Sequence, residues 1–136
     1  LDVGCGSGVL SIAALAMGAA HAVGLDIDDE AVISAKNNIK EAGFSNRARV
    51  LSGSVPHIDL ADVSFEVVGA NIAANVLIDL SHTLVSTVTE NGIIIASGVL
   101  VSRLDEVVSA FESAGGTVRS SRRIDDWTMA LITREN

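Results

Sequence analysis

Three glycines at alternate positions, Gly4, Gly6 and Gly8, stand between a short apolar segment and an apolar helical run. Because glycine has no Cβ, backbone N–H groups in such a turn can approach a ligand closely, and the chain can adopt positive φ. The helix that follows adds unpaired N–H donors and the positive end of its dipole. This pattern predicts a turn that cradles a cofactor, with a tight turn that binds nothing as the alternative.

The spacing of these glycines indicates which cofactor the turn would hold. A dinucleotide-binding turn has the pattern Gly-x-Gly-x-x-Gly, whose third glycine lies where helix and strand pack most closely. That third position is Val9 in this chain, and the additional glycine is Gly8. The alternating pattern, preceded by an acidic residue, resembles the first motif of class I S-adenosylmethionine-dependent methyltransferases. The predicted cofactor contacts in this turn are Asp2, Gly4, Cys5, Gly6 and Gly8.

Three later positions are predicted to contact the adenosine part of such a cofactor. Asp26 ends an apolar run roughly twenty residues after the turn, where a carboxylate can accept hydrogen bonds from both ribose hydroxyls. An exposed loop aspartate is the alternative interpretation of Asp26. We expect Ile27, next to it, to contact the adenine. Ser54 follows the third predicted strand and is expected to approach the adenine amine, although aspartate is commoner at that place.

Among the other polar side chains, Asn71 is the candidate for the reacting centre, and it is also a predicted cofactor contact. It follows the predicted strand 65–70, and open α/β sheets bind ligands at the carboxyl ends of their strands. For Cys5, a packing role between two glycines is favoured over a reactive thiol. His57 is interpreted as a surface residue because no metal-binding spacing surrounds it, and no metal site is predicted.

Helices and strands that would position these residues alternate along the chain. Apolar runs predict strands at residues 1–3, 21–26, 49–54, 65–70 and 93–96, with a turn at 91–92 and a loop at 55–64. Apolar faces and caps predict helices at 9–17, 29–42, 74–84 and 104–114. The expected buried faces include Ala42 and Leu80, and Gly115 and Gly116 are expected to cap the last helix. Residues 117–124 and 127–133 predict an antiparallel hairpin. The predicted class is α/β, a Rossmann-like, mostly parallel sheet with helices on both faces and a C-terminal antiparallel hairpin.

Composition limits the classes of partner. The chain has 136 residues, which fits one domain, 1–136, and it is 49% apolar with a mean hydropathy of +0.45. Its net charge of −8 disfavours direct nucleic-acid binding and suits a basic polypeptide better. The single cysteine excludes an intrachain disulfide and indicates a reducing compartment, the cytoplasm. No apolar run predicts a membrane span, and nothing in the sequence indicates an oligomeric state.

Several segments beyond the glycine turn are together similar to the bacterial ribosomal protein L11 methyltransferase family. They are residues 68–72, 76–80, 97–100 and 126–127, together with Gly53-Ser54. Members of that family transfer methyl groups from S-adenosylmethionine to lysine and N-terminal amino groups of a large-subunit ribosomal protein. The resemblance therefore implies this activity, this cofactor and this partner, and it implies that Ser54 in place of aspartate is ordinary. It also implies that an N-terminal recognition domain and a cofactor-binding segment precede residue 1 in the parent protein, so the chain is expected to be a truncated catalytic domain.

The chemistry that the resemblance implies requires an aligned, uncharged amine. The side-chain carbonyl of Asn71 is expected to orient that amine and to stabilise the positive charge that develops on its nitrogen. The sequence after Asn71 lacks the two prolines and the aromatic residue typical of enzymes that methylate nucleobase amines, which argues against a flipped base. Two alternatives stay open: a cofactor-binding module that is nearly inactive by itself, and a small-molecule methyltransferase.

Overall fold

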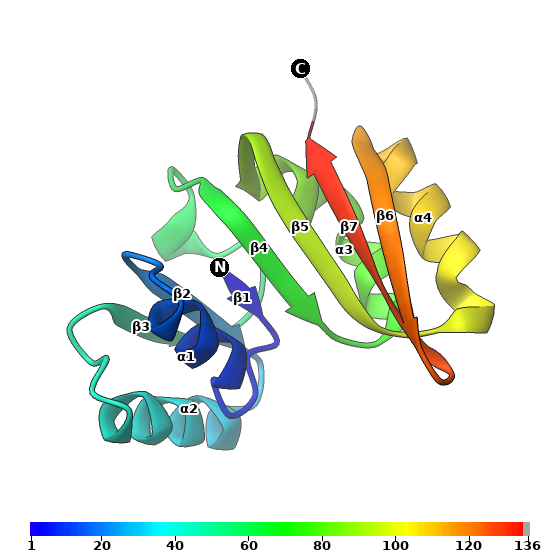
Figure 1. Ribbon diagram of the computed structural model, residues 1–136. Helices are drawn as coiled ribbons and strands as arrows, with labels where there is room; N and C mark the ends of the chain where they lie inside the picture. Colours follow the sequence, from blue (N-terminus) through cyan, green and yellow to red (C-terminus); the bar gives the residue numbers. More distant parts are fainter. Residues whose placement is uncertain (135–136) are drawn as a thin grey trace. The chain divides into compact units, whose positions relative to one another are not determined.

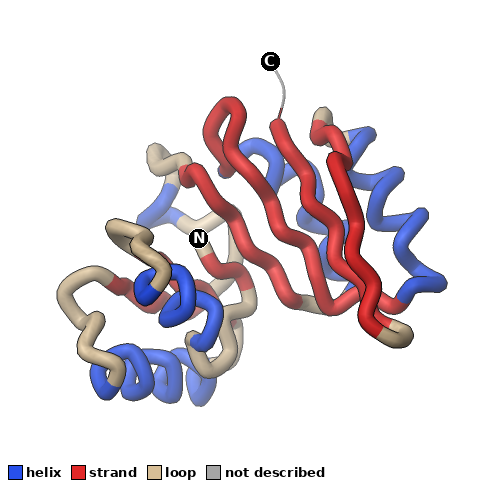
Figure 2. Tube along the Cα trace, in the orientation of Figure 1, coloured by secondary structure: helices blue, strands red, loops and turns tan. Residues whose placement is uncertain are grey.

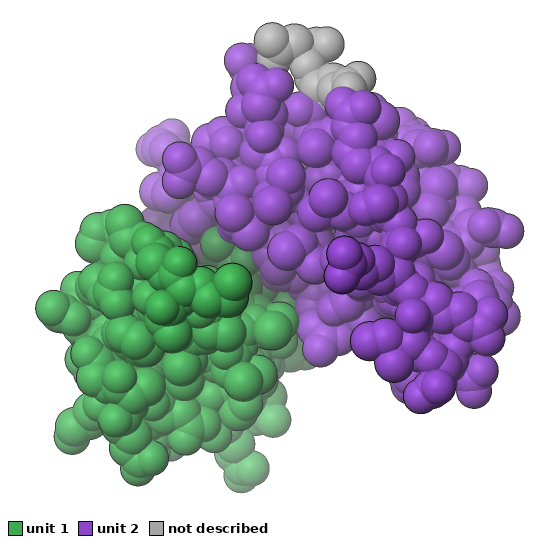
Figure 3. Space-filling model, in the orientation of Figure 1, with its two compact units in different colours: residues 1–57 green, residues 58–136 purple. Residues whose placement is uncertain are grey.

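The computed structural model describes residues 1–134, and the described residues divide into two compact units, 1–57 and 58–134 (Figure 3). Strands and helices alternate along the chain up to the last two strands, which follow each other directly (Figure 1). The predicted α/β class with a C-terminal antiparallel hairpin is confirmed.

The first unit contains three parallel strands in the order β3-β2-β1. Its elements are β1 (Asp2–Val3), α1 (Val9–Ala16), β2 (Ala22–Asp26), α2 (Asp29–Glu41) and β3 (Ala48–Ser52). A buried cluster between α2 and the strands is formed by Cys5, Val32, Ala35, Ile39 and Val50. Since parallel strands end at the same edge, the glycine turn, Ile27 and Gly53 each follow a strand at that edge.

The second unit contains four strands in the order β4-β5-β7-β6. Its elements are η1 (Ile58–Leu60), β4 (Phe65–Asn71), α3 (Ala74–Thr87), β5 (Val88–Leu100), η2 (Val101–Arg103), α4 (Leu104–Ser113), β6 (Gly116–Ile124) and β7 (Trp127–Arg134). β4 and β5 are parallel, whereas β7 is antiparallel to both β5 and β6. In the view of Figure 2, α3 and α4 lie behind these four strands. Leu77 of α3, Phe111 of α4, and Ile94 and Ile132 of the strands are all fully buried.

Capping residues set several helix ends as predicted. The carboxylate of Asp28 accepts the N–H of Glu30 at 2.9 Å and caps α2, and Gly18 and Gly43 follow α1 and α2 with positive φ. Gly115, with φ of 88°, ends α4. These helices therefore begin and end within one or two residues of their predicted bounds.

Other details of the prediction were wrong. Gly116 is the first residue of β6, not a cap, and a Cβ there would lie 2.8 Å from Cγ2 of Ile132. Ala42 is exposed because it follows the last residue of α2, and Leu80 is only half-buried. β5 begins at Val88, before the predicted turn; Asn91 has the positive φ of a turn residue, 62°, but lies in an irregular part of the strand.

Candidate functional site

The glycine turn is tied to the end of β2 by its own backbone. Gly4, Gly6 and Gly8 all have positive φ, of 71°, 53° and 81°. The N–H groups of Gly4 and Cys5 both donate to the carbonyl of Leu25, at 2.8 and 2.9 Å. The N–H of Gly8 donates to the carbonyl of Cys5 at 2.8 Å, which closes the turn before α1 begins.

Asp26 lies beside this turn, where the sequence places a ribose ligand. Its Oδ2 accepts the N–H of Gly6 at 2.8 Å, and its Oδ1 accepts the N–H of Asp28 at 3.0 Å. Each carboxylate oxygen can accept a second hydrogen bond, so both remain able to receive a hydroxyl. Ile27, the next residue, is 80% exposed and presents an apolar surface beside the carboxylate.

Asp2 has a structural role that the sequence did not reveal. It is only 6% exposed, and its Oδ2 accepts both the N–H and the hydroxyl of Ser11, at 3.1 and 2.8 Å. Because Gly8 at the start of α1 has no capping side chain, Asp2 supplies that cap from the preceding strand. Burial raises the pKa of Asp2, and its Oδ1 has no hydrogen-bond partner among the described residues.

Gly8 also permits the close approach of α1 to α2. A Cβ on Gly8 would lie 3.2 Å from the Cβ of Ala35, so a larger residue would push the two helices apart. The side-chain amide of Asn38, on α2, donates to the carbonyl of Ser7 at 2.9 Å. α2 therefore holds the turn, a role for Asn38 that no local pattern indicated.

Cys5 is packed rather than exposed to a ligand. Its side chain is 6% exposed, and its Sγ lies 3.0 Å from where a Cβ of Gly24 would be. Burial, together with the smaller effect of the nearby carboxylates of Asp2 and Asp26, raises the pKa of the thiol to about 11. The packing role favoured for the thiol is therefore seen in the structure, and the N–H of Cys5 already donates to Leu25. Cys5 as a cofactor contact stays a prediction.

We expect the thiol of folded Cys5 to react with iodoacetamide about 100-fold more slowly at pH 8 than the thiol of the unfolded chain. Its pKa is raised from 9.0 to about 11, so fewer thiolates are present at that pH. Mass spectrometry of timed samples, with and without urea, measures both rates. Equal rates would show that the thiol is exposed and ionisable.

Ser54 and His57 follow β3 in the first unit. Ser54 is half-buried and lies two residues after Ser52, the last residue of β3. His57 is half-buried too, and its Nε2 lies 3.2 Å from the carbonyl of Ser52. Its interpretation as a surface residue rather than a ligand stays a prediction.

Asn71 is the last residue of β4 and pairs with Ser97 of β5. Its side chain is exposed at the carboxyl ends of these two parallel strands, as predicted. Oδ1 of Asn71 lies 2.7 Å from the position that a Cβ would occupy on Gly98, whose φ is 78°. Because Gly98 has no Cβ, it leaves the space in which the Asn71 side chain lies. In the sequence, Gly98 stood out only as part of a family motif.

A cavity of about 580 Å³ adjoins Asn71 within the second unit, and we call it the β-end cavity. It is lined by Asn71, Ser97, Gly98, Arg122, Ile124, Trp127, Thr128 and Met129. Cavities of about 300–1,000 Å³ with mostly apolar walls and a few polar groups are typical ligand sites. Of its lining, only Asn71 was a predicted site residue, because the others come from strand ends far apart in sequence.

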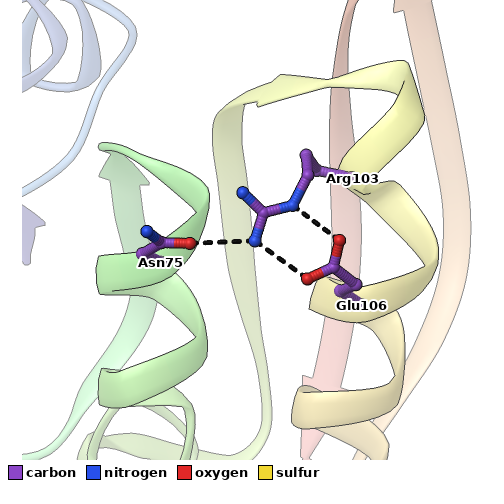
Figure 4. Close-up of polar contacts among 3 residues, drawn as sticks. All are labelled: Asn75, Arg103 and Glu106. Atoms are coloured by element: carbon purple, nitrogen blue, oxygen red, sulfur yellow. Dashed lines mark hydrogen bonds and ion pairs between the residues drawn. The ribbon is translucent and has the colours of Figure 1, made fainter.

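The segment that follows β5 is held by hydrogen bonds to three neighbouring elements. The guanidinium of Arg103 makes two bonds to the carboxylate of Glu106, at 2.6 and 2.8 Å, and one to Oδ1 of Asn75 at 2.8 Å (Figure 4). The N–H of Val101 donates to the carbonyl of Asp126 at 2.9 Å. η2 is thereby linked to α3, to α4 and to the β6–β7 turn.

Residues 1–134 contain neither a candidate metal site nor a candidate membrane-spanning helix. No group of three or more His, Cys, Asp or Glu side chains in this range could hold a metal ion. None of the helices described is long and apolar enough to cross a membrane.

Comparison with known sequences finds a family model and relatives that all carry the same description. The chain matches the family model for ribosomal protein L11 methyltransferase (PrmA) over residues 1–135. It is 39% identical over 114 residues to the ribosomal protein L11 methyltransferase of Sodalis glossinidius, which covers 84% of this chain and 38% of that relative. A relative of the same name from Clostridium botulinum is 36% identical over 126 residues, covering 93% of this chain and 39% of the relative. The chain thus spans about two fifths of the length of the curated relatives it matches.

Solved structures share the fold. A ribosomal protein L11 methylase from Lactobacillus delbrueckii subsp. bulgaricus matches with a TM-score of 0.90 at 33% identity, covering 99% of this chain and 69% of that one. An RNA methyltransferase from Salinibacter ruber, solved with S-adenosyl-L-homocysteine, matches with a TM-score of 0.75 at 20% identity, covering 99% of this chain and 80% of that one. The second likeness concerns the fold alone.

Proposed function

We propose, because this chain belongs to the ribosomal protein L11 methyltransferase family, that it binds S-adenosylmethionine and methylates amino groups of a large-subunit ribosomal protein. The match of residues 1–135 to the family model is the observation that carries this proposal. The acceptors are lysine side chains and the N-terminal amine. One methyltransferase domain over residues 1–136 is part of the same proposal.

The residues of the first unit fit the proposed cofactor. Three glycines of positive φ open the turn, and the carboxylate of Asp26 beside it retains two acceptor positions for ribose hydroxyls. The exposed Ile27 supplies an apolar surface for the adenine, and Ser54 supplies a polar group after the next strand. Asp2 acts mainly through the cap of α1 that fixes the turn. S-adenosylmethionine, when bound, supplies a methyl group on a positively charged sulfur, already activated for transfer.

Asn71 is the proposed catalytic residue of the second unit. An amine can accept a methyl group only through its lone pair, so the acceptor must be uncharged and aligned. The side-chain oxygen of Asn71 accepts an N–H of the amine and stabilises the positive charge that develops on nitrogen. Its place at the carboxyl end of β4, beside the β-end cavity, supports this role.

The partner and location follow from the same family membership. A ribosomal protein is a basic polypeptide, and the charge of −8 on this chain favours such a partner over direct contact with nucleic acid. A cytoplasmic location is proposed because the partner is a ribosomal protein. Mass spectrometry of purified large-subunit ribosomal proteins tests the activity, after incubation with S-adenosylmethionine and a protein that contains this chain at the full length of its relatives. The isolated chain is expected to be almost inactive in the same assay.

Calorimetry tests the cofactor site. We expect the chain to bind S-adenosylmethionine or its demethylated product more tightly than NAD, and Asp26→Ala to weaken that binding by about 1.5–3 kcal/mol, the usual loss for hydrogen bonds to a charged acceptor. Asp105→Ala removes the same charge from the exposed first turn of α4 and serves as the control. Equal or tighter binding of NAD contradicts the choice of cofactor, and an Asp26→Ala affinity within about twofold of the unmutated chain contradicts the ribose contact.

A further inference from the structure

The lining of the β-end cavity carries a positive charge, whereas the chain as a whole is strongly negative. Among the described residues, Arg122 is the only charged one in its lining, although the chain as a whole carries a net charge of −8. No carboxylate within residues 1–134 lines it, so a cation that enters meets a like charge without a neutralising partner in the described wall. Like charges disfavour the charged form of a titratable group nearby.

Other charged groups on the neighbouring elements do not line the cavity. Nε of Arg123 donates to the backbone carbonyl of Asp125 at 2.6 Å, at the β6–β7 turn. The Asp125 and Asp126 carboxylates belong to that turn and are not lining residues. On the side of α3 and α4, the guanidinium of Arg103 is already paired with Glu106. The charge of Arg122 is therefore the one that faces the cavity.

The remaining walls suit an unbranched apolar stem. Ile124 and Trp127 face each other across the β6–β7 pair, and they are 76% and 55% exposed. Met129 pairs with Arg122 in the same hairpin, so apolar and cationic groups lie on adjacent strands. The hydroxyl of Thr128 donates to the backbone carbonyl of Arg122 at 3.0 Å and fixes that strand. The side-chain oxygen of Asn71 and the hydroxyl of Ser97 supply acceptors at the strand ends.

We propose that the β-end cavity takes the acceptor as an uncharged alkyl amine, and that Arg122 selects this form by repelling the ammonium. This inference rests on the proposed function, because it makes the cavity the acceptor site of that reaction. An ordinary lysine amine, with a pKa of about 10.4, is protonated at neutral pH. Arg122 lowers the pKa of the bound amine, so that its proton passes to water before methyl transfer.

The chain's single tryptophan, Trp127, allows a binding test that requires no turnover. Its fluorescence is titrated at pH 7 with butyltrimethylammonium, a permanent cation, and with 1-butanol, an uncharged probe with the same stem. In the unmutated chain we expect the cation to bind about tenfold more weakly than the alcohol, and Arg122→Gln to abolish that difference. Arg122→Lys retains the charge and should retain the difference. Arg123→Gln, which removes the neighbouring charge outside the lining, should retain it too.

Each other outcome overturns the inference. Equal binding of the two probes by the unmutated chain would mean that Arg122 does not repel cations, and an unchanged ratio in Arg122→Gln would assign the repulsion elsewhere. Absence of a response to either probe would mean that the cavity does not take a four-carbon stem.

A kinetic measurement separates this inference from the proposed function. In the methylation assay, Arg122→Gln should raise the pH midpoint of kcat by about one unit and lower KM for the acceptor, which a purely structural defect would not do. Methylation with an unchanged midpoint would overturn the role of Arg122 alone. Probe selectivity without methylation of any amine would overturn the proposed function while the charge selection by Arg122 stands.

Discussion

Replacement of Asn71 by alanine is expected to lower kcat by about 100- to 1,000-fold, the usual loss when one group that stabilises developing charge is removed. The Kd for S-adenosylmethionine should change by less than about twofold, because Asn71 lies beside the β-end cavity and the proposed adenosine contacts lie in the first unit. Steady-state kinetics with a ribosomal protein acceptor and calorimetry with the cofactor measure the two quantities.

Asn37→Ala is the matched control for Asn71→Ala. Asn37 is an exposed amide on α2 and lies outside every proposed contact, so both kcat and Kd should be retained. An equal loss of turnover and cofactor affinity in Asn71→Ala would assign Asn71 to the cofactor site and contradict its catalytic role.

Replacement of Gly98 by alanine is expected to lower kcat by about 100-fold, since a displacement of about 1 Å at a positioned group can have that effect. The new Cβ would lie 2.7 Å from Oδ1 of Asn71 and 3.0 Å from the carbonyl of Ile72, so the amide must move. In the double variant with Asn71→Ala, the loss should be far from additive, because both changes act on the same side chain. Kinetics of the two single variants and the double variant measure this coupling.

Gly115→Ala separates the clash at Gly98 from backbone strain. Gly115 has a φ of 88°, close to the 78° of Gly98, but a Cβ there would contact nothing within 4 Å. Both variants should lose about 1–2 kcal/mol of unfolding free energy from the left-handed conformation. Only Gly98→Ala should lose turnover. A similar fall in kcat for Gly115→Ala would mean that general destabilisation causes the effect.

Local patterns were sufficient to predict most of the elements and the family. Alternating glycines, the Asp28 cap and the apolar faces of α2 and α4 are each encoded within a few residues, and the structure has each of them. The resemblance to ribosomal protein L11 methyltransferases is confirmed by the family model and by identities of 39% and 36% to relatives from two bacterial genera. The predicted bounds of β5 were wrong because that strand contains an irregularity near Asn91.

Contacts between residues far apart in sequence could not be predicted. Asp2 caps α1 nine residues later, and Asn38 holds the glycine turn from 31 residues away. The β-end cavity assembles Asn71 with a hairpin more than fifty residues later, so nothing near Arg122 in the sequence indicated that it lines the same cavity as Asn71. The predicted cofactor contacts in the first unit and the catalytic role of Asn71 stay predictions.

The strand order of the second unit also constrains how the chain is made on the ribosome. β7 is the last strand in sequence, yet it lies between β5 and β6 and forms the only described link between them. Until residues 127–134 have emerged, one edge of β5 has no neighbour, and β6 has nothing to pair with. Unpaired strand edges are templates for joining other chains. Synthesis that stalls before Trp127 would therefore leave a nascent product with unpaired edges on β5 and β6, exposed to aggregation and to the chaperones that recognise it.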